Sequence, residues 1–145
     1  MDTVHLIAGV AVLVSNAVAG GWGAYAWLRH EPAVGFWYVL RFAQVSVVLQ
    51  VLIGAVLLLL GRAAPDDLHY LYGVLPLAVS LLAEAARAGA AERELEGVDF
   101  DLLPVDRQRS FALAIVRRET GIMAVSALVV FGLALRAAGT SGALF

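Results

Sequence analysis

Residues 50–73 read QVLIGAVLLLLGRAAPDDLHYLYG, and this stretch decides the fold. It contains the end of one long apolar run, a short polar turn and the start of a second apolar run. Gly61 is of the residue type that commonly ends a helix, and Asp66 or Asp67 can cap the start of the next one. The pattern predicts two helices joined by a tight turn, with His69 in the first turn of the second helix.

The apolar character of this stretch continues on both sides of it. Of the 145 residues, 61% are hydrophobic, whereas about 45–50% is typical of soluble domains. A helix needs about 20 mostly apolar residues to cross a bilayer. We therefore expect one domain, residues 1–145, that is all-α and forms an integral membrane four-helix bundle of up-down-up-down topology. Its crossing segments are predicted at 3–28, 34–60, 68–86 and 120–135, with a cytoplasmic helical connection at 87–119 and a short tail after Arg136.

The distribution of arginine predicts the orientation of the bundle. One side holds the connections that follow the first and third helices, and it carries Arg29, Arg87, Arg93, Arg107, Arg109, Arg117 and Arg118. The opposite side carries Arg62 and Arg136. Because cytoplasmic loops are enriched in basic residues, this predicts a multi-pass protein of the inner membrane with both termini outside. The chain begins MDT, without the basic start of a secretory signal, so we expect the first helix to be retained.

Two compositional absences narrow the possible functions. The chain has no cysteine, which excludes disulfides, c-type haem attachment, thiolate-bound metals and iron–sulfur clusters. It also has no basic tract of the kind that binds nucleic acid. The expected partners are the lipid bilayer and either a larger membrane complex or further copies of the same chain.

Two histidines are the candidate ligands of a cofactor. His5 and His69 each begin an apolar run, and each is followed four residues later by a glycine, Gly9 and Gly73. Positions i and i+4 share a helix face, so the glycines, together with Gly54, can leave room for a flat macrocycle. Imidazoles from facing helices commonly hold haem iron, which predicts haem b with both histidines as axial ligands. Alternatively, the histidines simply meet water at a membrane interface, and the glycines serve helix packing.

The same residues resemble one four-helix half of the haem A synthase family. The resemblance covers about the first 90 residues and is carried by His5, the segment QVLIG at 50–54, the turn with Pro65, and the segment LHYLYG at 68–73. In that family such histidine pairs bind haem near the outer membrane face. Leu6 stands where the family usually has arginine, and the family's second half, catalytic carboxylate and loop cysteines have no counterpart. The resemblance therefore implies haem binding without haem A synthesis.

A second constellation consists of charged and polar residues in the predicted membrane segments. Arg41 and Glu84 are expected at similar depth on antiparallel helices, and charges inside a membrane are usually paired or functional. We expect an intramembrane ion pair or, with Gln44 and Gln50, a polar track. The predicted function is a small b-type cytochrome-like protein in electron transfer or haem handling. The alternatives are a cofactor-free structural or accessory subunit, and a small carrier or channel.

Overall fold

The computed structural model describes residues 3–64 and 66–140, and all regular structure in these ranges is helical. The elements are α1 (Thr3–Arg29), α2 (Val34–Leu59), α3 (Leu68–Leu95), the short 3-10 helix η1 (Phe100–Leu102) and α4 (Val105–Thr140). By length and composition, each of the four α-helices can cross a membrane. This confirms the predicted all-α class with four membrane-length helices.

The helix boundaries differ from the prediction mainly at the end of α4. The predicted tail after Arg136 is wrong for the described residues, because α4 remains helical to Thr140. Two alanines follow Arg136 and favour the helix, and the Thr140 hydroxyl donates a hydrogen bond to the carbonyl of Ala137 at 2.9 Å. Pro65, which belongs to the predicted turn, lies outside the described residues.

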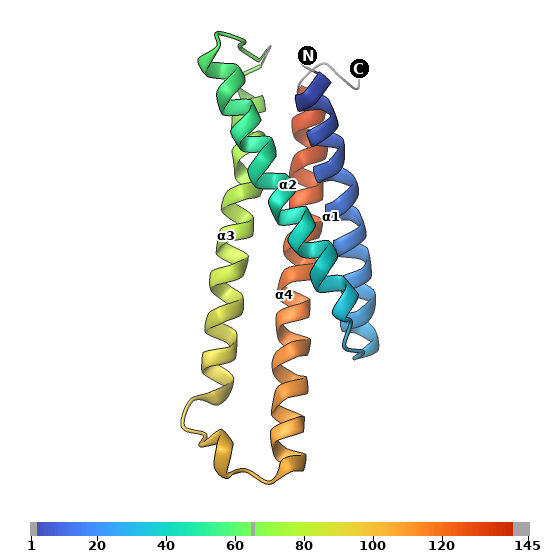
Figure 1. The fold of residues 1–145 in the computed structure, drawn as a ribbon, viewed down its shortest axis with the longest axis vertical. Helices are drawn as coiled ribbons and strands as arrows, with labels where there is room; N and C mark the ends of the chain where they lie inside the picture. The colour runs from blue at the N-terminus through green and yellow to red at the C-terminus, as the bar shows by residue number, and fades with distance from the viewer. Residues whose placement is uncertain (1–2, 65, 141–145) are drawn as a thin grey trace.

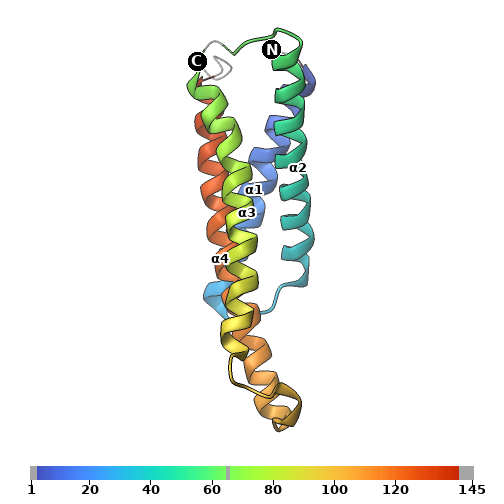
Figure 2. The ribbon, with the colours of Figure 1, turned by 90° about the vertical axis from the view of Figure 1, so that its left-hand side faces the viewer.

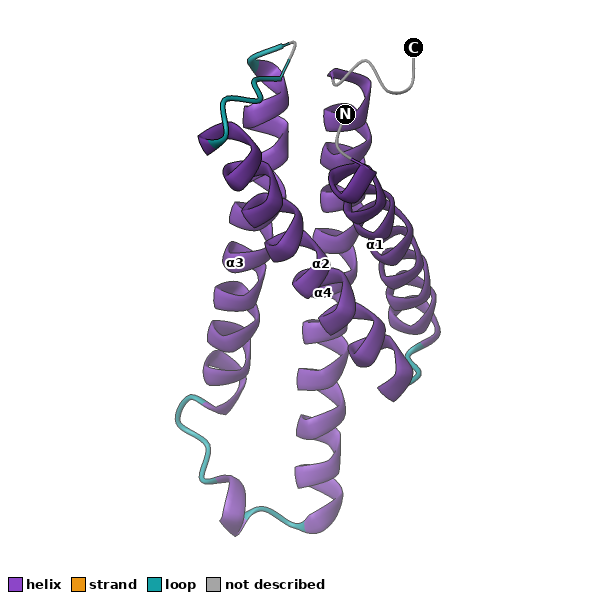
Figure 3. Cartoon of the chain, turned by 45° about the horizontal axis from the view of Figure 1, so that its top comes forward, coloured by secondary structure: helices purple, strands orange, loops and turns teal. Residues whose placement is uncertain are grey.

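The central helix of the bundle is α4, which packs along both α1 and α3 (Figures 1 and 2). The remaining helix, α2, lies against α1, has smaller interfaces with α3 and α4, and is tilted relative to them (Figure 3). The two chain termini lie at the same end, which we call the terminal end (Figure 1). At the opposite end, α3 and α4 extend beyond α1 and α2 and are joined through η1 (Figure 1). We call this the hairpin end.

Two helices end in the same hydrogen-bonded motif. At the end of α1, the N–H of Glu31 donates to the carbonyl of Ala26 at 3.0 Å, and the N–H of His30 donates to that of Trp27 at 3.3 Å. These are the two bonds of a Schellman motif, which places His30 in the left-handed region with φ of 60°. Gly61 has the corresponding position after α2, with φ of 77°. Glycine adopts this conformation without strain, whereas histidine does not.

Small residues bring the helices close together in the core. Alanine and valine supply most of the buried side chains. Many of these side chains form two clusters: Ala19, Phe36, Leu40, Ala43, Ala83, Met123 and Ala127 in one, and Val12, Val47 and Val130 in the other. Many larger apolar side chains are exposed on the outer faces of the helices, among them Val14, Leu52, Leu82 and Val129. Close approach through small residues is typical of helices that pack in lipid.

Substitution of Gly23 by alanine should destabilise the fold. A Cβ atom at Gly23 would lie 2.5 Å from Cε2 of Phe36 and 2.9 Å from Cβ of Ala124. Because Phe36 is fully buried, we expect a loss of about 1–3 kcal/mol. Gly21 is the control, since a Cβ there meets no described atom within 4 Å and alanine is the better helix former. Thermal unfolding in detergent, followed by circular dichroism, compares the two variants; equal midpoints would contradict the close packing at Gly23.

Candidate functional site

The structure brings His5 and His69 together at the terminal end. His5 lies in the first turn of α1 and His69 in the first turn of α3. Although they are far apart in the sequence, their ring centroids are 6.0 Å apart and their ring planes are inclined by 59°. We refer to His5 and His69 as the histidine pair.

A hydrogen bond to α4 orients the ring of His69. Its Nδ1 lies 3.0 Å from the carbonyl oxygen of Ala137, and since a carbonyl can only accept, Nδ1–H is the donor. The neutral ring then carries its lone pair on Nε2, which is the state in which an imidazole binds a metal. The start of α3 is held by the Leu68 N–H, which donates to Oδ1 of Asp66 at 2.9 Å, and by the Tyr70 hydroxyl, which accepts from the Ala64 N–H at 2.7 Å.

Gln50 on α2 provides a neighbour for His5. Nε2 of Gln50 lies 3.2 Å from Nε2 of His5, so the amide donates to the lone pair of the ring. Oε1 of Gln50 is buried and has no hydrogen-bond partner among the described residues. If Nε2 of His5 carries the proton instead, a 180° rotation of the Gln50 amide lets Oε1 of Gln50 accept a hydrogen bond from it. Gln50 therefore matches either tautomer of His5.

The glycines near the histidine pair do not all leave open space. A Cβ at Gly9 would lie 3.3 Å from Nε2 of Gln50, so the space expected beside Gly9 is filled by that amide. A Cβ at Gly54 would lie 3.5 Å from Cε1 of His5. At Gly73 and at Gly132 of α4, a Cβ would meet no described atom within 4 Å. Gly132 is exposed, so the space at that residue lies on the outer surface of α4, whereas Gly73 is partly buried one turn after His69.

The spacing of the histidine pair is of the size that two imidazoles bound to one iron ion would have. Metal–imidazole bonds of about 2.0–2.1 Å place the ring centroids of two such ligands about 6 Å apart, and the observed separation is 6.0 Å. Among the described residues, no three His, Asp or Glu side chains gather into a metal-binding group. Two imidazoles suit haem iron, because the porphyrin supplies the remaining four nitrogen ligands.

A network of charges connects α2, α3 and α4 farther along the bundle. Arg41 forms an ion pair with Glu84 and donates to Oε1 of Gln44 at 2.6 Å. Gln44 in turn donates to Oε1 of Glu84 at 2.8 Å, and Nε of Arg87 donates to Oε2 of the same carboxylate at 2.9 Å. Arg87 also reaches Glu119 on α4 at 3.5 Å. We call these five residues the charged network.

Two members of the charged network do not follow from the sequence pattern. The sequence marks Arg87 only as a basic residue of the helical connection, and it gives Glu119 no role. The spacing of Glu84 and Arg87 is a usable signal, because residues three apart on a helix are neighbours. The guanidinium of Arg87 also lies 5.8 Å from the ring centroid of Trp37. Gln50 contacts the histidine pair, so Gln44 and Gln50 belong to separate groups.

Comparisons with known proteins add no family to this description: no family model, curated protein or solved structure matches the chain.

Proposed function

We propose that the chain is a small membrane protein of the b-type cytochrome kind, with a role in electron transfer or haem handling. In this proposal, His5 and His69 are the two axial ligands of one haem b. The observation that carries it is the 6.0 Å separation of the two imidazole centroids. Haem held by two imidazoles supplies one-electron transfer, since both axial positions of the iron are filled by the protein.

The neighbouring residues have positioning roles in this proposal. The Ala137 carbonyl holds Nδ1–H of His69 and thereby directs the lone pair of Nε2 away from α4's backbone. Gln50 orients the ring of His5. Gly54 lies beside this ring, with space for no more than a methyl group between them, and Gly73 leaves open space one turn along α3 from His69. The space beside Gly9 is used by Gln50, so Gly9 supports the pair through that amide.

We further propose that the bundle spans the inner membrane four times, up-down-up-down, with both termini outside. Support comes from the exposed valine and leucine side chains on the helices and from the excess of arginine toward the hairpin end. This orientation puts the histidine pair near the outer face, where the haem A synthase family, which the sequence resembles, binds haem. The catalytic residues of that family are missing, so haem A synthesis is not proposed.

A visible absorption spectrum tests the proposed function. The protein is expressed with added δ-aminolevulinate, purified in mild detergent, and measured oxidised and after reduction with dithionite. We expect one haem per chain, with a Soret band and the sharp α band of six-coordinate, low-spin iron on reduction, because both axial ligands are imidazoles. A colourless protein, also after incubation with hemin, would contradict the proposal and favour a cofactor-free accessory subunit.

A further inference from the structure

A cavity of about 280 Å³ lies at the far end of the molecule from the histidine pair. It is partly open to the surroundings and is lined by the end of α1, the connection at 30–32 and the segment of α4 around residues 113–120. Most of its wall is apolar, but Trp27, His30, Arg117 and Thr120 contribute groups that can donate hydrogen bonds, and Glu31 contributes one carboxylate. The cavity therefore combines an apolar lining with hydrogen-bond donors.

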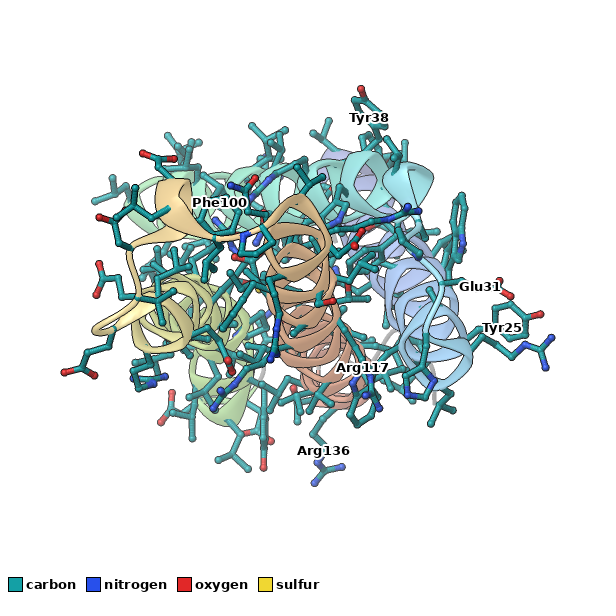
Figure 4. All side chains as sticks on the ribbon, turned by 90° about the horizontal axis from the view of Figure 1, so that it is seen from below. Tyr25, Glu31, Tyr38, Phe100, Arg117 and Arg136 are labelled. Carbon is teal, nitrogen blue, oxygen red and sulfur yellow. The ribbon has the colours of Figure 1, made fainter. Side chains whose placement is uncertain are left out.

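Arg117 differs from the adjacent arginine in its pairing. Arg118 forms an ion pair with Glu94 of α3 at 2.5 Å. Arg117 lines the cavity, and no carboxylate of the described residues is within ion-pair distance of it. Glu31 also lines the cavity, but it lies at the end of α1 whereas Arg117 lies on α4 (Figure 4), and the two are not within ion-pair distance of each other. A positive charge without a counterion in the described part of the chain thus faces the cavity.

Two further residues of the wall, His30 and Trp27, have defined local environments. His30 occupies the left-handed position that ends α1, where glycine would be unstrained. A non-glycine residue in this conformation commonly indicates a functional constraint. The indole Nε1 of Trp27 approaches α4 so closely that a Cβ at Gly121 would lie 2.8 Å from it. The indole of Trp27 thus packs against α4 at Gly121, next to the lining residue Thr120.

We propose that this cavity binds the phosphate head group of an anionic phospholipid. Arg117 would pair with the phosphate, and Trp27 and His30 would donate hydrogen bonds to its oxygens. The apolar wall would contact the start of an acyl chain. A phospholipid is favoured over a soluble phosphate ester, because Trp22, Trp27 and Trp37 mark this level as a membrane interface. The proposal requires the membrane orientation given above but is independent of haem.

Binding of dioleoyl phosphatidylglycerol to the detergent-purified full chain, measured by native mass spectrometry, tests the proposal. We expect wild type to prefer it over phosphatidylcholine. Arg117→Gln should weaken the association about tenfold, since a charge-assisted contact is lost, while Arg118→Gln should change it less than about twofold. Equal losses in the two variants, or no preference between the lipids in wild type, would overturn the assignment to this cavity.

Two additional measurements test the role of His30 and distinguish a phospholipid from a soluble phosphate ester. His30→Gly should weaken phosphatidylglycerol binding without lowering the thermal midpoint, because glycine relieves the left-handed conformation; unchanged binding would remove His30 from the site. Glycerol 3-phosphate should bind at least about tenfold more weakly than the lipid, since it lacks acyl chains to contact the apolar wall. If it binds as tightly, the ligand is a soluble phosphate ester and the lipid assignment is wrong.

Discussion

Alanine at His69 should abolish the low-spin haem spectrum and weaken haem binding by more than about 100-fold. Even outer partners of a metal ligand contribute about 10–100-fold in affinity, so loss of the ligand itself should exceed that range. The remaining His5 would leave five-coordinate, high-spin iron, with a shifted Soret band and a broadened α band after reduction. His5→Ala should have the same effect, because both imidazoles would be needed to hold the haem in the proposed site. Hemin titration and electron paramagnetic resonance measure both changes.

His30→Ala is the matched control for these substitutions. His30 lies at the hairpin end, so its removal should leave the haem spectrum unchanged. If His5→Ala and His69→Ala keep the wild-type spectrum, any bound haem is held elsewhere and the histidine pair is not its ligand set. If His30→Ala alone removes the spectrum, the site lies at the opposite end of the bundle. Both outcomes would contradict the proposed function.

Hydropathy and helix-ending residues are sufficient to predict the helices and the similar depth of the two histidines. Long apolar runs define membrane-length helices, and Gly61 ends α2 as expected, with φ of 77°. His5 and His69 each open an apolar run at the same side of the predicted bundle, so their similar depth follows from topology. The 6.0 Å separation of their ring centroids cannot be predicted from topology alone, because it depends on the rotation of α1 and α3 about their axes.

Helix rotation also accounts for what the sequence does not reveal. The helices α1 and α2 are nearly uniformly apolar and have no strong polar face to fix which residues meet, so the contact of Gln50 with His5 beside Gly9 cannot be predicted from the sequence. For a related reason, the role of Glu119 cannot be predicted from the sequence. It follows two arginines in the hairpin, and only the register of α4 against α3 places it next to Arg87. The left-handed backbone conformation of His30 at the end of α1 cannot be predicted from the sequence either, since glycine is the residue expected in that conformation.

Substitution of Glu84 by glutamine should destabilise the bundle by about 3 kcal/mol, because it leaves the partly buried Arg87 and Arg41, whose half-exposed side chain would face lipid in the proposed membrane, with a single carboxylate. Glu84 accepts hydrogen bonds from Arg41, Gln44 and Arg87. It therefore has more partners within the charged network than any other member of that network. Few waters can replace these contacts among apolar helices. Unfolding in detergent with increasing dodecyl sulfate, followed by helix content, measures the loss.

The matched control is Glu94→Gln, which removes a carboxylate of similar side-chain exposure, 30% against 28% for Glu84. Glu94 pairs with Arg118 at the hairpin end, where water is expected to surround the pair, so its loss should cost less than about 1 kcal/mol. Equal effects of the two substitutions would mean that the charged network also lies in water. A second substitution, Arg41→Gln, should recover part of the stability lost in Glu84→Gln, because it removes one of the uncompensated charges. Without such recovery, Glu84 would act through packing rather than through charge.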